Sequence, residues 1–504
     1  MCFRGRAAWR LALFSFLGLS FAASQPEDPA AKSQRAKEMM AAGQFSQAIP
    51  IYEELLRAMP DNPGIRLDLA LAQHMSGRER EAIPNFEAVL KVQPNLMPAW
   101  LSLAAARLAL NQPELAVAPL EKVLAAEPRN QDARGMLGSA LLYLGRFEQS
   151  AQQFRELTSL SPRDPRAWYG LGKSYESMAT AAFDRLQKVD PTSPYVSALV
   201  AGTRVQNRQY RSAFFFYREA LKQLPGLHGI HAALAEVYRK TGHPDWAAAE
   251  EAKERVLPAP NCAQHPGECQ FLGGHDIQAL TMPEGAAPSP EALYWQVKAA
   301  NELALQSFFR LGQLPPSVES HELKAEILRN QKRHLESAKE WRAALELSPG
   351  NPRLEHELAV SLFLAEDYKA ALAEAAAFLK ANPQSAEMNF MAGDSLLRME
   401  QPEQAIPYLR HALSAEPGLA AAHASLGLAL SRLGKSAEAA PHLEKAIGLD
   451  DDGSLHYQLA RAYQAAGQAE KARAAMAQYQ EILKKNQEQK EAVAREAQIV
   501  PPQQ

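Results

Sequence analysis

Prolines recur along this chain at a fixed step of 34 residues. The step occurs in two runs: Pro60, Pro94, Pro128 and Pro162, and then Pro349, Pro383 and Pro417. An apolar run with helical spacing precedes each proline, and polar residues that can cap a helix follow it, such as Asp61 and Asn62. A fixed period of this size predicts a stack of helical repeats, each of which packs only on its neighbours.

Small and large residues occupy matching places in the first four units. The set is Gly43, Ala48 and Tyr52; Gly77, Ala82 and Phe86; Trp100, Ala116 and Leu120; and Gly138, Gly145 and Phe154. This order resembles the tetratricopeptide repeat, and the chain resembles an exported bacterial protein of that family. The resemblance implies an all-α fold, an α-solenoid superhelix. Along the sequence we count about thirteen helix-turn-helix repeats, two of them shortened with fused helices.

The two shortened units lie at 165–193 and 290–317. In the first, Pro191 follows Pro162 after 29 residues, and no glycine or proline between Gly172 and Pro191 marks a turn. Residues 292–311 align without gaps with residues 167–186, so the shortened unit occurs twice. We predict one long helix in each, at about 166–188 in the first, because the turn residues of a hairpin are missing.

The pattern divides the chain into five segments. They are a signal peptide (1–24), an N-terminal repeat array (25–257), a Pro/Gly-rich insertion with a cysteine pair and no helical period (258–289), a C-terminal array (290–485), and a polar capping helix with a frayed tail (486–504).

The N-terminus predicts export. Arg4, Arg6 and Arg10 precede an apolar run at 11–21, and small residues follow it. That order is typical of a cleavable signal peptide, so we expect a periplasmic or secreted protein; an uncleaved anchor is the alternative. No later stretch reaches the length of a transmembrane helix, so we expect no span after signal removal.

The insertion holds the one group of residues with metal-ligand chemistry. Cys262, His265, Cys269 and His275 offer two thiols and two imidazoles, but the paired C-x₂-C spacing of zinc sites is absent. In an exported protein, a disulfide between Cys262 and Cys269 is favoured over a zinc site. We therefore expect no metal and no cofactor.

Catalytic motifs are absent from the sequence. It contains no G-x-x-x-x-G-K-[ST], H-E-x-x-H or G-x-S-x-G pattern. The net charge of −3 gives no basic footprint for nucleic acid. We therefore predict no catalytic residues and a protein that is not an enzyme; an active site in the insertion is a weaker alternative.

Candidate binding residues come from the resemblance, which implies that the first helix of each repeat lines a concave face. The matched shortened units place Tyr169 and Lys173 on one helical face, and Tyr294 and Lys298 on another. An aromatic ring beside a cation suits a peptide or a glycan. The alternative is that both pairs simply pack against neighbouring helices.

These observations favour a non-catalytic scaffold that binds a partner protein or peptide through its concave face in an exported or envelope assembly. The alternative is a carbohydrate-associated scaffold in polysaccharide export or cell-wall metabolism, with direct glycan contact. Fold alone does not choose between them, because one scaffold serves many partners.

Overall fold

The computed structural model of the chain describes residues 28–280, 289–496 and 498–502, with the backbone alone at 492–496. The predicted signal peptide (1–24) lies outside the described residues. All regular structure in the described residues is helical, as predicted. Contacts divide the chain into two compact units, one ending at Ala140 and the other beginning at Leu141.

The first compact unit contains three helix pairs. Its helices are α1 (Pro29–Ala41), α2 (Phe45–Ala58), α3 (Pro63–Met75), α4 (Glu79–Val92), α5 (Met97–Ala109) and α6 (Pro113–Ala126). The division between the units falls inside α7 (Gln131–Tyr143).

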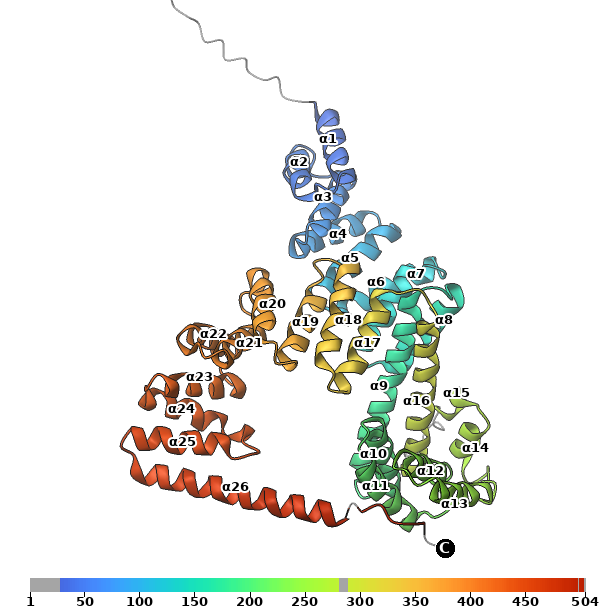
Figure 1. Ribbon diagram of the computed structural model, residues 1–504. Coiled ribbons are helices and arrows are strands. Elements are labelled where there is room, and N and C mark those ends of the chain that lie inside the picture. Colours follow the sequence, from blue (N-terminus) through green and yellow to red (C-terminus); the bar gives the residue numbers. More distant parts are fainter. Residues whose placement is uncertain (1–27, 281–288, 497, 503–504) are drawn as a thin grey trace, which may run out of the picture. The chain divides into compact units, whose positions relative to one another are not determined.

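The remaining α-helices belong to the second compact unit, and Figure 1 labels each of them. They are α8 (Phe147–Leu160), α9 (Pro165–Val189), α10 (Pro194–Gln206), α11 (Tyr210–Gln223), α12 (Ile230–Lys240), α13 (Pro244–Arg255), α14 (Pro266–Leu272), α15 (Asp276–Ala279), α16 (Pro290–Gly312), α17 (Val318–Asn330), α18 (His334–Leu347), α19 (Pro352–Leu364), α20 (Tyr368–Ala381), α21 (Ala386–Arg398), α22 (Pro402–Ala415), α23 (Ala420–Arg432), α24 (Ser436–Ala446), α25 (Ser454–Ala465) and α26 (Ala469–Glu496).

The repeat positions explain why these segments fold as helix pairs. In α2, α4 and α6 the residues at one repeat position are fully buried alanines, which let two helices approach closely: Ala48, Ala82 and Ala116. Four residues later, large side chains fill the space beside them: Tyr52, Phe86 and Leu120. The polar residue after the closing proline caps the next helix, as in Asn62, whose Oδ1 accepts from the Gly64 and Ile65 amides.

Both fused helices are confirmed. α9 has 25 residues and α16 has 23, where a regular repeat has a helix pair. The two long helices pack side by side in opposite directions (Figure 1). Each has lost the partner within its own repeat, so each buries its apolar face against the other. Leu186 near the end of α9 lies in the same apolar cluster as Leu293 near the start of α16, whereas Leu171 shares a cluster with Ala304.

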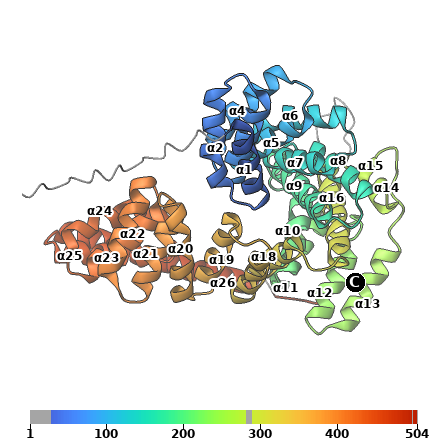
Figure 2. The ribbon, with the colours of Figure 1, turned by 90° about the horizontal axis from the view of Figure 1, so that it is seen from above.

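This pairing holds the two sides of the insertion together. The sequence predicted no helical period between 258 and 289, but the structure places α14 and α15 there, both packed on α16 (Figure 2). Residues 281–288 of the insertion lie outside the described residues. The insertion therefore does not separate two compact bodies, and the division between units falls earlier, at Ala140.

At the C-terminal end, the second helix of the last repeat is extended beyond the repeat. The expected capping helix is the continuation of α26, which runs without a break from the last repeat to Glu496. The tail that follows, at 498–502, has neither helix nor strand. Among the helices that the structure describes, none is both long and apolar enough to cross a membrane.

Candidate functional site

Tyr169 and Lys173, predicted to bind a ligand, lie on α9 and face α17. The Tyr169 hydroxyl donates to Glu326 Oε1 at 3.2 Å. Lys173 Nζ donates to Glu326 Oε2 at 3.2 Å and to Glu176 Oε2 at 2.6 Å. Burial, and then the charge of Glu326, raises the pKa of Tyr169, so this hydroxyl stays protonated and donates.

The matched pair on α16 has different surroundings. Tyr294 is 2% exposed, and its ring centroid lies 5.1 Å from that of Tyr195. Lys298 Nζ lies 5.7 Å from the centre of the Phe271 ring, and burial lowers its pKa. Both matched pairs therefore pack against neighbouring helices, as the alternative interpretation expected. Contact of these four residues with a partner stays a prediction, and the buried Tyr294 ring offers almost no surface for it.

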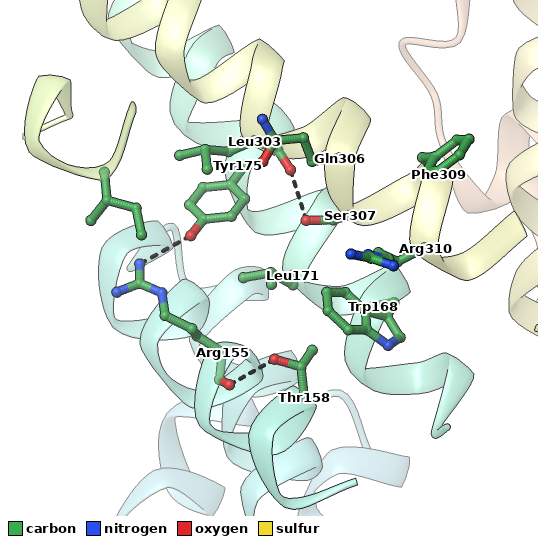
Figure 3. Close-up of a pocket in the computed structure, with 11 residues that line it drawn as sticks. Arg155, Thr158, Trp168, Leu171, Tyr175, Leu303, Gln306, Ser307, Phe309 and Arg310 are labelled. Carbon is green, nitrogen blue, oxygen red and sulfur yellow. Dashed lines mark hydrogen bonds between the residues drawn. The ribbon is translucent and has the colours of Figure 1, made fainter. Parts of the chain in front are cut away.

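A pocket of about 510 Å³ lies where the two fused helices meet α8 and α15 (Figure 3). Its lining combines two guanidinium groups, aromatic rings and aliphatic side chains: Arg155, Thr158, Trp168, Leu171, Tyr175, Ile277, Leu303, Gln306, Ser307, Phe309 and Arg310. Arg155 Nη2 donates to the Tyr175 hydroxyl at 3.0 Å, and the buried Nε of Arg155 has no hydrogen-bond partner among the described residues.

The side chains that line this pocket are suited to binding a ligand. Its lining contains arginines but no aspartate or glutamate, so it favours an anionic or carbonyl-bearing group. The rings of Trp168 and Tyr175 supply apolar contact beside the charge. The sequence did not reveal this pocket, because it forms only when helices far apart in the chain come together.

A second surface is occupied by the chain's own C-terminus. The Tyr238 hydroxyl donates to the Val500 carbonyl oxygen at 2.8 Å. The half-buried side chains of Ile499 and Val500 pack on an apolar cluster formed mainly by α10 to α13. Tyr238 and Trp246 belong to that surface, and their rings meet edge to face with centroids 5.6 Å apart. We call this area the tail-binding surface.

Ile499 and Val500 of the tail are therefore packed, and fraying at Pro501 and Pro502 stays a prediction. In Figure 1 the segment after α26 reaches the helices α10 to α13. Burial, and then the charge of Glu250, raises the pKa of Tyr238 to about 12, so its hydroxyl is protonated and donates at neutral pH. Two apolar side chains and one backbone carbonyl of the tail make the contact.

In the insertion, the structure joins Cys262 and Cys269 in a disulfide, with an S–S distance of 2.07 Å. His265 lies inside the loop that the bond closes. The ring of the other predicted candidate, His275, lies beside Gly273.

Comparison with known families agrees with this architecture. Models described as "Tetratricopeptide repeat" match residues 39–107, 107–174 and 390–454. The chain is a tetratricopeptide repeat protein. Such repeats support a role as a protein-interaction scaffold. No curated protein sequence matches this repeat protein significantly.

Solved structures of other repeat proteins resemble parts of the chain. A tetratricopeptide repeat protein from Parabacteroides merdae is 12% identical and covers 66% of this chain and 98% of its own, with a TM-score of 0.32. MamA from Desulfovibrio magneticus is 20% identical, with coverages of 34% and 96% and a TM-score of 0.31. YrrB, described as having an unusual peptide-binding site, is 22% identical, with coverages of 32% and 84% and a TM-score of 0.28.

Proposed function

We propose that this repeat protein is a non-catalytic scaffold that binds a short apolar peptide segment of a partner protein on the tail-binding surface. The observation that carries the proposal is the hydrogen bond from Tyr238 to the Val500 carbonyl, made while Ile499 and Val500 pack on the same surface. The tail is a peptide of this chain that already occupies the site.

Because the tail belongs to the same chain as the tail-binding surface, even a weak contact between them stays formed. A segment linked to its own binding surface acts at an effective concentration of about the millimolar range. A partner segment must therefore bind more tightly than the tail to replace it. Pro501 and Pro502 reduce the conformational freedom of the unbound tail, so less entropy is lost when it binds.

We also propose that the protein works outside the cytoplasm, in an exported or envelope assembly. The order of arginines, apolar run and small residues near the N-terminus supports export. The disulfide between Cys262 and Cys269 supports an oxidising compartment, because such bonds persist there and are rare in the cytosol.

Peptide binding to a truncated chain tests the proposed site. A chain that ends at Glu496 lacks the tail, and a fluorescent peptide with the sequence of residues 498–504 replaces it. We expect saturable binding to the truncated chain at peptide concentrations up to about 1 mM, and binding at least about tenfold weaker to the full-length chain. Fluorescence polarisation measures both. Absence of saturable binding to the folded truncated chain contradicts the proposal.

Substitutions at two separate tyrosines, Tyr238 and Tyr463, provide a test of the site and its control. In the truncated chain, Tyr238→Phe removes the hydroxyl that meets Val500 and should weaken the peptide by about 2- to 10-fold, as expected for one hydrogen bond. Tyr463→Phe removes the hydroxyl that donates to Glu444, far along the chain, and should leave peptide affinity unchanged. Equal effects of the two substitutions would argue against the site.

A further inference from the structure

Four ionisable side chains meet at the insertion: His228, His265, Glu268 and Glu291. His265 Nδ1 lies 2.8 Å from Glu291 Oε1 and 3.0 Å from its Oε2. His228 Nδ1 lies 2.8 Å from Glu268 Oε1. One ligand atom each from His265, Glu268 and Glu291 lies within 4.8 Å of the other two. An imidazole and two carboxylates are thus gathered around one point.

Three separate segments of the chain bring these groups together. His265 and Glu268 lie inside the loop closed by the disulfide of Cys262 and Cys269. Glu291 lies in the first turn of α16, and His228 precedes α12. The disulfide limits the freedom of His265 and Glu268, and α16 positions Glu291, so the group is preorganised by rigid elements.

The geometry differs from that of the ordinary histidine–glutamate pairs in this protein. His321 with Glu340 is a single pair, and Glu250, the partner of His231, has Lys253 rather than a second carboxylate beside it. In the part of the chain that the structure describes, only His265, Glu268 and Glu291 form a group that meets the spacing of a metal site. Ligand atoms in a tetrahedral zinc site with bonds of about 2.0–2.1 Å lie about 3.3 Å apart, so small side-chain movements complete the site.

The energetics also favour a cation at this point. Glu268 is 8% exposed, and the side chain of Glu291 is 24% exposed. The ion-pair partners of both carboxylates are histidines. A divalent ion therefore compensates two partly desolvated negative charges better than the histidines do.

We propose that His265, Glu268 and Glu291 bind a zinc ion, and that His228 orients Glu268 through its hydrogen bond. Imidazole and carboxylate are established zinc ligands, and a water molecule supplies the fourth position. The cysteines are oxidised in the disulfide and do not take part, which distinguishes this site from a thiolate site. The ion joins the insertion to α16 and so stabilises the insertion.

Zinc binding by the tag-free, disulfide-intact, full-length chain tests the site. We expect about one zinc per chain by metal analysis after gel filtration, with micromolar or tighter affinity in calorimetry. Zinc should raise Tm. Glu291→Gln and His265→Gln, at partly exposed positions, should each abolish uptake and the Tm increase while the helical circular dichroism is retained. His228→Ala should weaken zinc by about 10- to 100-fold, as for a residue that orients a ligand.

The single pair of His321 and Glu340 supplies the matched control. His321→Gln should bind zinc as the unmodified chain does, because that histidine pairs with one carboxylate and belongs to no group of three metal ligands among the described residues. Uptake below one-tenth of an equivalent by the unmodified chain would overturn the proposal. So would unchanged uptake in both Glu291→Gln and His265→Gln, which would place any bound zinc elsewhere.

Discussion

The ring of Phe308 on α16 lies against Gly172 on α9, so closely that a Cβ at position 172 would be 2.3 Å from Phe308 Cε1. This contact lies where the two shortened repeats pack on each other. A side chain at position 172 would hold the helices apart. The glycine therefore permits the pairing that keeps the insertion and both flanking helices in one compact unit.

Gly172→Ala should destabilise the protein by roughly 1–3 kcal/mol, because a methyl group at this position overpacks the α9–α16 contact. Chemical denaturation measures the change. Phe308→Leu in the same chain should recover part of the loss, giving a coupling energy on the order of 0.5–3 kcal/mol in a double-mutant cycle. Gly312→Ala is the control, because nothing lies within 4 Å of a Cβ there, and it should not destabilise the protein.

The repeat fold was predictable because its signals are local. Most regular units carry their own closing proline and buried alanine, so the 34-residue step indicates the helix pairs without knowledge of distant contacts. The fused helix α9 was predictable for the same reason, since no turn residue lies between Gly172 and Pro191.

The turns between paired helices differ in their backbone strain. Gly434 adopts a φ of 73° in one turn, and the same turn one repeat earlier places Glu400 at a φ of 60°. Left-handed backbone costs a residue with a Cβ roughly 1–2 kcal/mol but costs glycine little. Glu400→Gly should therefore stabilise the protein by up to about 1 kcal/mol, and Gly434→Ala should destabilise it by about as much. Thermal denaturation of the two variants measures both signs, and a loss of stability in Glu400→Gly would contradict this account.

A histidine between two carboxylates should make stability depend on pH. Glu357 and Glu387 raise the pKa of His356 to about 9, with His356 Nε2 at 2.9 Å from Glu387 Oε2 and Nδ1 at 3.9 Å from Glu357 Oε1. Since the pKa of an unfolded histidine is about 6.5, protonated His356 stabilises the folded state below pH 6.5, and this contribution is lost as pH rises to 9. We expect a loss of roughly 1–3 kcal/mol across that range.

His356→Gln tests this dependence. The unmodified chain and the variant are denatured with urea at pH 6 and at pH 9.5, and the difference between their free energies of unfolding is compared. The difference should be larger at pH 6. An equal difference at both values would mean that the ion pairs of His356 do not contribute to folding.

The binding surfaces were less predictable, because they depend on contacts between distant segments. Tyr169 and Tyr294 match in sequence, yet one meets Glu326 on α17 and the other is buried beside Tyr195. The sequence match reflects that each tyrosine lies on one of the two fused helices. The surroundings of each tyrosine depend on the helices that pack against its fused helix. Tyr238 and Val500 are 262 residues apart, and no local pattern relates them.

The residues of the proposed zinc site were also only partly predictable from the sequence. The sequence suggested His265 and His275 together with two cysteines, because these residues are close along the chain. The structure instead gathers His265 with Glu268 and Glu291, the last of which belongs to α16. Only His265 and Glu268 were near enough in sequence to suggest a common site.

A charge placed in the tail should free the tail-binding surface. Val500→Asp in the full-length chain puts a carboxylate against the apolar cluster that holds Val500, so the tail should dissociate while the surface itself is unchanged. The added peptide with the sequence of residues 498–504 should then bind at least about tenfold more tightly than to the unmodified full-length chain, approaching its affinity for the chain that ends at Glu496. Gln498→Asp adds the same charge at an exposed position of the tail and should leave the tail bound. If both variants bind the peptide equally, charge alone accounts for the effect and the packing of Val500 does not hold the tail.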